Sequence, residues 1–133
     1  MRKTAPVNDS EPVRLVSPSE RTESDSAGGA IRERAIEVDG MWSGFVRTAP
    51  GMDSGWHHHG DYETSIYVAR GSLCMESGPG GTHVTLASEG DFLHVPRGAI
   101  HRERNDGDQE SHLVVVRAGH GVPTMKVDGP APR

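Results

Sequence analysis

The chain has 133 residues, of which 33% are apolar and 5% aromatic, and its formal net charge is −5. This length suits one domain that buries its own core, and the absence of a Lys- and Arg-rich cluster among aromatic residues argues against a nucleic-acid partner. The only cysteine, Cys74, cannot form an internal disulfide. Neither a signal peptide nor a membrane-length apolar stretch is visible. We therefore expect a cytoplasmic protein that binds no membrane.

Residues 1–30 are rich in Ser, Glu, Pro, Thr and Asp, a composition typical of flexible segments. Within this stretch, residues 13–16 could add an edge strand. We predict a flexible N-terminal arm over residues 1–30, a folded domain over 31–119 and a Gly- and Pro-rich tail over 120–133.

Short runs of β-forming residues fill the middle of the chain, and Gly and Pro separate them. Asp39-Gly40 is a hairpin signal, and Ile66, Tyr67 and Val68 are typical strand residues. No segment has a convincing helical pattern. The predicted strands are 32–38, 41–49, 56–59, 64–70, 72–76, 83–87, 91–95, 100–104 and 112–117. Short strands with frequent turns are typical of an all-β sandwich or barrel.

Two histidines, His57 and His59, are separated by one residue in a predicted strand. Side chains two residues apart on a strand point to the same face, so these imidazoles converge while His58 faces the other way. Neutral imidazole is a good ligand for several divalent metals. The spacing therefore predicts half of a metal site.

A third histidine follows a tight turn. Pro96-Arg97-Gly98 lies between two predicted strands and delivers His101 to the start of the second one. An imidazole there could complete a face of ligands with the earlier pair.

These two segments resemble the paired motifs of the cupin superfamily. In the first family motif, two glycines flank a pair of histidines separated by one residue and a glutamate that follows them. The second motif has, in this order, a glycine, a Pro-x-Gly turn, a histidine and an asparagine. The chain matches the first motif at Gly51, His57, His59 and Gly71, and the second at Gly90, Pro96, Gly98, His101 and Asn105.

The resemblance implies an all-β fold, a cupin-type jelly-roll barrel of about 8–10 short antiparallel strands. It also implies one divalent metal ion per chain in the mouth of the barrel. Iron, zinc, nickel and manganese all accept imidazole ligands. The ligands carried over from the motifs are His57, His59 and His101.

The glutamate of the first motif is displaced in this chain. Counting back from the last glycine of the motif places it at Thr64, whereas counting forward from the second histidine places it at Glu63. Ile66 and Val68 alternate in step with Thr64, and an apolar strand face is usually the core face, so Thr64 should point inward. A β-bulge just before the strand would reverse this for Glu63. We favour a site of three histidines without this glutamate.

Glu103 has the same strand parity as His101 and should therefore point into the barrel. It could replace the displaced ligand, orient a ligating histidine through a hydrogen bond, or act on the substrate as a general acid or base. It could instead pair with an arginine such as Arg47 or Arg70. We name Glu103 as the candidate catalytic residue.

Three functions fit these observations. We favour a metal-dependent enzyme acting on a small organic substrate, either a dioxygenase or a Lewis-acid isomerase, cyclase or lyase. The alternatives are a small-molecule-binding cupin whose metal is structural or tethers a ligand, and a metal-free sugar epimerase. The last needs a tyrosine acid facing a histidine base, and only Tyr62 and Tyr67 are available.

We also expect a homodimer. An open jelly roll exposes the edges of its sheets, and pairing between subunits hides such edges. The N-terminal arm over residues 1–30 could cross to the partner subunit.

Overall fold

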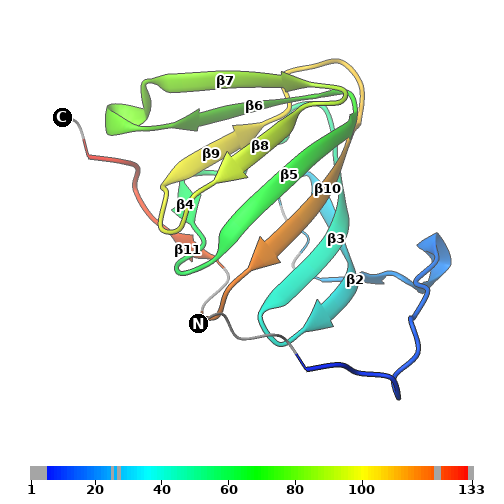
Figure 1. Ribbon diagram of the computed structural model, residues 1–133. Helices are drawn as coiled ribbons and strands as arrows, with labels where there is room; N and C mark the ends of the chain where they lie inside the picture. The colour runs from blue at the N-terminus through cyan, green and yellow to red at the C-terminus, as the bar shows by residue number, and fades with distance from the viewer. Residues whose placement is uncertain (1–5, 25, 27, 122–123, 132–133) are drawn as a thin grey trace.

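Two antiparallel β-sheets enclose one core in the computed structural model, which describes residues 6–24, 26, 28–121 and 124–131 (Figure 1). The six-stranded sheet has the order β1-β2-β3-β10-β5-β8. Its strands are Thr22–Glu23 (β1), Ala30–Val38 (β2), Met41–Thr48 (β3), Ser111–Ala118 (β10), Glu63–Arg70 (β5) and Phe92–Val95 (β8). The five-stranded sheet has the order β11-β4-β9-β6-β7. Its strands are Met125–Lys126 (β11), His57–His58 (β4), His101–Arg104 (β9), Ser72–Ser77 (β6) and His83–Ser88 (β7).

The predicted all-β jelly roll is confirmed. Each of the nine predicted strands is present, with its ends within two residues of the predicted ones, and the regular helical elements of the described residues are two short 3-10 turns, Pro18–Glu20 (η1) and Pro79–Gly81 (η2). No helix in the described part of the chain is long and apolar enough to cross a bilayer. The cytoplasmic location stays a prediction.

Both ends of the chain contribute strands that were not predicted. β1 pairs with β2, and β11 pairs with β4, so that Lys126 lies opposite His57. The strands therefore extend beyond the 31–119 range expected for the barrel. Residues 13–16, by contrast, form no strand, and only Val16 among them is half-buried while the others are exposed.

The core lies between the two sheets, and strand alternation decides which side chains fill it. In β5, Thr64, Ile66 and Val68 are buried while the residues between them are half-buried or exposed. Val68 and, on β6, Leu73 are 0% exposed. Burial of each such side chain contributes roughly 2 kcal/mol to folding. The predicted parity of β5 is thus confirmed, and Thr64 points inward.

A buried asparagine joins three strand ends behind the predicted metal site. Asn105, which follows β9, is 1% exposed. Its side-chain amide donates to the carbonyl oxygens of Thr48 at 3.1 Å and Gln109 at 3.0 Å, and its Oδ1 accepts the Gly107 N–H at 3.0 Å. Its backbone N–H donates to the Met52 carbonyl at 2.9 Å. These bonds hold the ends of β3, β9 and β10 together with the loop that leads to His57.

Asn105→Ala should lower the free energy of unfolding by about 3 kcal/mol, because it leaves several buried polar groups without partners. Urea denaturation followed by circular dichroism measures this change. Asp108→Ala, in the same loop but exposed, is the control and should have little effect. A loss for Asn105→Ala no larger than for Asp108→Ala would contradict the structural role.

Candidate metal centre

Four side chains meet on the inner face of the five-stranded sheet. His57, His59, His101 and Glu103 each offer one ligand atom, and these atoms all lie within 4.8 Å of one another. His57 on β4 and His101 on β9 are direct neighbours in the antiparallel register. The three histidines are 6%, 5% and 1% exposed. The structure therefore brings together all three histidines of the two motifs and adds Glu103, as its parity predicts.

Backbone carbonyls orient two of the imidazoles. Nδ1 of His57 lies 2.9 Å from the Gly55 carbonyl oxygen, and Nδ1 of His101 lies 2.9 Å from the Ala99 carbonyl oxygen. Because a carbonyl can only accept, each Nδ1 carries the hydrogen and each Nε2 is left for the cluster. The same pattern fixes the tautomer of histidines that bind metals.

His101 shows that this cluster fits a metal ion. Its Nε2 is buried and makes no hydrogen bond with the described residues, and the nearest carboxylate oxygen, Oε1 of Glu103, is 3.4 Å away. A buried polar atom without a hydrogen bond calls for a partner. A divalent cation between imidazole nitrogens and a carboxylate oxygen would supply one.

Glu103 provides the negative charge of the cluster. Burial acts to raise the pKa of its carboxyl group, but the adjacent His101 imidazole, with the charges of His57 and His59, lowers that pKa to about 2. Burial lowers the pKa of His57. For His101 burial also acts downward, but the Glu103 carboxylate outweighs it and raises the pKa. Glu103 is therefore ionised at neutral pH and complements a cation.

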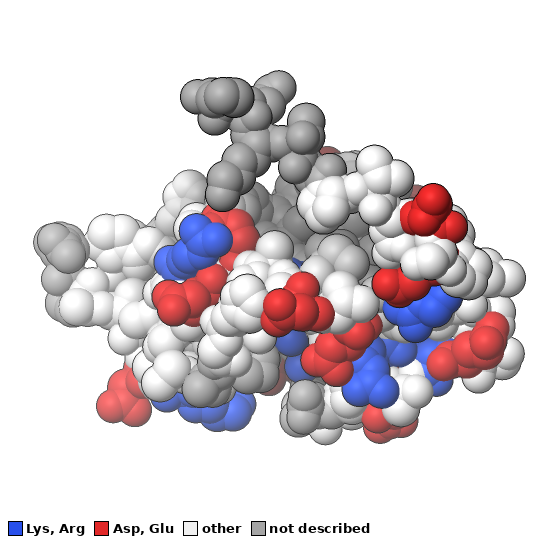
Figure 2. Space-filling model, turned by 60° about the horizontal axis from the view of Figure 1, so that its bottom comes forward, with Lys and Arg blue, Asp and Glu red and all other residues white. Residues whose placement is uncertain are grey.

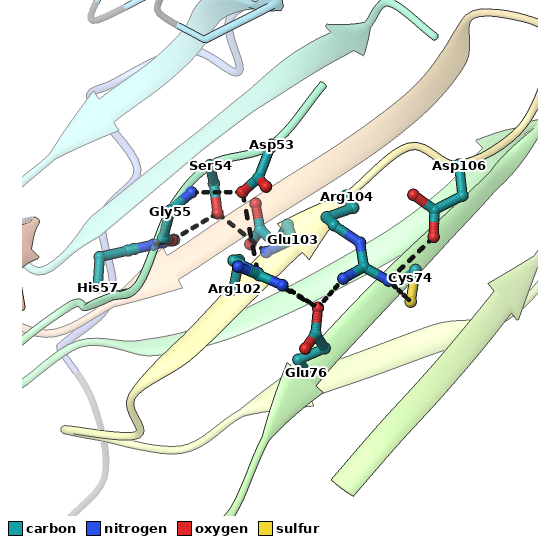
Figure 3. A network of polar contacts seen from close by, with 10 residues as sticks. All are labelled: Asp53, Ser54, Gly55, His57, Cys74, Glu76, Arg102, Glu103, Arg104 and Asp106. Atoms are coloured by element: carbon teal, nitrogen blue, oxygen red, sulfur yellow. Dashed lines mark hydrogen bonds and ion pairs between the residues drawn. The ribbon is translucent and has the colours of Figure 1, made fainter. Parts of the chain in front are cut away.

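Ser54 ties Glu103 to the segment that carries His57 (Figure 3). The Glu103 N–H donates to Ser54 Oγ at 2.9 Å, and the Ser54 N–H donates to the Glu103 carbonyl at 2.9 Å. The Ser54 hydroxyl in turn donates to the Gly55 carbonyl at 2.9 Å, the same oxygen that accepts from His57. β4 has only two residues, so these bonds extend its attachment to β9. Sequence analysis did not single out Ser54, since only the fold brings it to Glu103.

Arg102, on the opposite face of β9, holds the same segment from outside (Figure 3). The Arg102 guanidinium lies 5.1 Å from the ring centre of Trp56 and pairs with Glu76 at 2.8 Å and with Asp53 at 3.9 Å. Arg104 also pairs with Glu76. The segment before His57 is thus attached to both faces of β9.

Neither of the two positions predicted for the family's glutamate, Glu63 and Thr64, is part of the cluster. Glu63 points outward, where its carboxylate lies 2.7 Å from His94 Nε2 and 3.3 Å from Arg97 Nη1. Thr64 is 2% exposed and points inward, as predicted, but is not part of the cluster. The carboxylate comes instead from Glu103. Among the described residues its ionic neighbour is His101, at 3.4 Å, and not Arg47 or Arg70.

A cavity of about 530 Å³ adjoins the cluster, and His57, His59 and Glu103 form part of its wall. Cavities of roughly 300–1,000 Å³ are typical of small-molecule sites. Much of the remaining wall is apolar and comes from the six-stranded sheet and the loop after β3. These apolar residues are Ala30, Val46, Met52 and Leu113.

The family model of the cupin domain matches residues 44–117, which is more than half of the chain. The chain belongs to the cupin family. Cupins usually bind a metal ion, and in this cupin the cluster of three histidines and Glu103 has the donors for one. No curated protein matches the chain in sequence.

Solved structures share the cupin fold of this chain. A Klebsiella pneumoniae protein with a double-stranded β-helix domain has a TM-score of 0.69 at 23% identity, covering 86% of this chain and 96% of its own. The polyketide cyclase RemF from Streptomyces resistomycificus has a TM-score of 0.73 at 19% identity, covering 87% and 86%. Oxalate oxidase in complex with glycolate has a TM-score of 0.70 at 18% identity, covering 92% and 68%. At these identities the likeness concerns the fold.

Glu103→Gln should weaken Zn²⁺ binding at least about tenfold, because it removes the only negative charge of the cluster. Competition with a chromophoric chelator measures the dissociation constant. Glu63→Gln is the matched control, since it changes the glutamate nearest the family's motif position, and it should bind Zn²⁺ like the wild type. Equal weakening by both changes, or weakening by Glu63→Gln alone, would contradict this assignment.

Proposed function

We propose that this cupin is a metal-dependent enzyme that acts on a small organic substrate. The observation that carries the proposal is the position of the cluster, whose His57, His59 and Glu103 form part of the wall of a substrate-sized cavity. A catalytic metal site keeps a coordination position open toward its substrate. On a six-coordinate ion the four donors of this cluster leave positions open, and the adjoining cavity gives a substrate access to them.

His57, His59 and His101 would hold the metal through their Nε2 atoms, and Glu103 would complete the set through its carboxylate. A metal bound there would supply Lewis-acid polarisation of a carbonyl group or, if it is iron, the activation of oxygen. The protein side chains would hold the ion in place, and the cavity would orient the substrate beside it. The reaction is then a dioxygenation, or an isomerisation, cyclisation or elimination.

Two of the structural neighbours support an enzymatic role. Oxalate oxidase and the polyketide cyclase RemF carry out two of the reaction types considered, an oxidation and a cyclisation, on this fold. A fold alone does not select a reaction. The choice between them rests on the metal and on the substrate.

Protein purified without a histidine tag should contain about one divalent metal ion per chain, and His101→Ala should lose it, because one of four donors is removed. Plasma mass spectrometry measures the metal content. His58→Ala is the control: His58 lies between the two motif histidines, but its Nδ1 accepts the Gly60 N–H at 3.1 Å, and the metal content should be unchanged. Substoichiometric metal in the wild type, with the same melting temperature before and after chelation, would contradict the proposal.

The catalytic part of the proposal needs turnover. Protein reconstituted with iron, zinc, nickel or manganese would be screened against small organic compounds by oxygen uptake and mass spectrometry. Turnover that is lost in His101→Ala would support an enzyme. Saturable binding without turnover would favour the alternative, a small-molecule-binding cupin with a structural or tethering metal.

We further propose that the protein forms a homodimer through the outer face of the six-stranded sheet. Phe45, Val114, Tyr67 and Phe92 are successive register neighbours across β3, β10, β5 and β8 and form an apolar row on that face. Phe92 is 71% and Val114 38% exposed. Exposed apolar rows of this kind are typical of protein interfaces.

The N-terminal arm favours a second copy of this chain as the partner. It reaches this face at Arg21, whose guanidinium lies 4.4 Å from the ring centre of Phe45. Beyond this contact the arm carries Val13 and Leu15, the first fully exposed and the second 84% exposed. In a two-fold dimer the apolar row of each copy and the arm of the other could cover one another.

Phe92→Ser should convert the dimer to a monomer at little cost in stability, because it places a polar group at the row and removes a side chain that is 71% exposed and whose ring lies 4.8 Å from that of Tyr67. Size-exclusion chromatography with light scattering measures the mass. Leu86→Ser is the control, since Leu86 is 67% exposed on β7 of the other sheet, and this variant should stay dimeric. A monomeric wild type, or dissociation by Leu86→Ser alone, would contradict this interface.

A further inference from the structure

The cavity beside the candidate metal centre is lined by both sheets, and the two sheets line it differently. The ligand cluster comes from the five-stranded sheet and the residue after β4, whereas the six-stranded sheet and the loop after β3 supply an apolar wall. This apolar wall consists of Ala30 on β2, Val46 on β3, Leu113 on β10 and Met52 in the loop. Val46 and Leu113 are direct register neighbours, so the wall continues from one strand to the next.

Two hydroxyl groups of the cavity lining are already hydrogen-bonded within the protein. Thr48 Oγ1 accepts from the Asn105 amide at 3.1 Å and also pairs with the Ser111 hydroxyl. The Ser54 hydroxyl accepts the Glu103 N–H at 2.9 Å and donates to a neighbouring backbone carbonyl. A ligand rich in hydroxyl groups, such as a sugar, would therefore find these two groups engaged.

The charged residues of the cavity lining give it no excess of either sign. Among the described residues, Arg32 and Lys126 are basic, and Asp53 and Glu103 are acidic. Asp53 accepts the Gly55 N–H at 2.9 Å, and Glu103 belongs to the ligand cluster. Moving an ion from water into such a cavity costs free energy, and here no opposite net charge of the side chains offsets that cost.

The outer surface differs from the apolar wall. On the face that Figure 2 shows, Lys and Arg lie among Asp and Glu, so that charges of the two signs offset one another. An extended patch of one sign would attract ligands of the opposite sign. No such patch is visible on the described residues in that view, so this face does not favour ions of either sign.

We propose that the cavity binds a small uncharged organic molecule, whose apolar body lies against Ala30, Val46, Met52 and Leu113. One polar group of the molecule would face the cluster, where a bound metal ion could contact it. Removal of apolar ligand surface from water drives such binding and requires no charged partner. This inference names the substrate class of the enzyme proposed above, an apolar compound and not a sugar or a small organic acid, and in that respect rests on that proposal.

N-phenyl-1-naphthylamine is a suitable probe, because it is uncharged and its fluorescence increases in apolar surroundings. Its analogue 8-anilino-1-naphthalenesulfonate has the same rings and one added negative charge. Fluorescence titration of chelator-treated protein should show at least about tenfold tighter binding of the uncharged dye, because the sulfonate group loses water without gaining an opposite net charge. The chelator removes any metal ion that would itself attract the sulfonate, and circular dichroism checks that the protein stays folded.

Met52→Gln should weaken binding of the uncharged dye about tenfold in the protein as purified, because it places an amide group in the apolar wall. Met41→Gln is the matched control: Met41 is 39% exposed on β3 and outside this wall, and the variant should bind like the wild type. Ala30→Asp, at a half-buried position, should also weaken binding and keeps the test valid if Met52→Gln fails to fold. Its control is Ala118→Asp, exposed at the end of β10.

Dye bound to the outer surface would be detected with Phe92→Ser and Leu86→Ser, which remove exposed apolar side chains from the two sheets. Both variants should bind the uncharged dye like the wild type. Weaker binding in either of them, with no change in Met52→Gln and Ala30→Asp, would overturn the inference. So would equal affinity for the two dyes in folded, chelator-treated protein, or the absence of saturable binding of the uncharged dye.

Failure of this inference can be distinguished from failure of the proposed enzyme. If the wild type binds no metal but the uncharged dye binds at the apolar wall, the enzyme fails while the apolar site stands. If metal binds and turnover depends on His101, but the dye does not respond to Met52→Gln or Ala30→Asp, only the apolar site fails.

Discussion

The candidate metal centre depends on the pairing of β4 with β9. His57 and His101 are opposite one another in this antiparallel pair, so their side chains project from the same face. His59, just past the end of β4, and Glu103 on β9 each lie two residues from that pair and flank it on the same face. A shift of one residue would turn one strand's ligands to the other face. The bonds between Ser54 and Glu103 oppose such a shift.

The pairing of β4 with β9 also offsets the energetic cost of burying a polar cluster. Buried imidazoles and a buried carboxylate are costly unless they find partners. Carbonyls of Gly55 and Ala99 accept from two of the imidazoles, and the carboxylate of Glu103 lies beside His101. Behind the cluster, Asn105 satisfies the backbone where three strands end. The buried Nε2 of His101 makes no hydrogen bond with the described residues, and a divalent cation would supply its partner.

Much of this arrangement follows from spacing along the chain. Strand parity places Thr64 inside and Glu63 outside, and it sends Glu103 to the same side as His101. Other features could not be predicted, because they join residues far apart in the sequence. β1 and β11 have two residues each and no apolar pattern. Ser54 gains its role from Glu103 on another strand, and Lys126 reaches the cavity wall only because β11 pairs with β4. The alternation of Ala30 and Arg32 is a signal that could have placed both on the inner face.

Two strands that supply part of the cavity wall, β2 and β11, lie outside the two motifs. β2 precedes the first motif and β11 follows the second, so these parts of the cavity wall are separate from the parts that carry the candidate metal ligands. Substitutions near residues 28–32 and 124–126 could change which molecules enter without disturbing the β4–β9 register. Because these wall strands and the metal ligands lie in different parts of the sequence, the fold could change its substrate preference through single substitutions while the metal site is preserved.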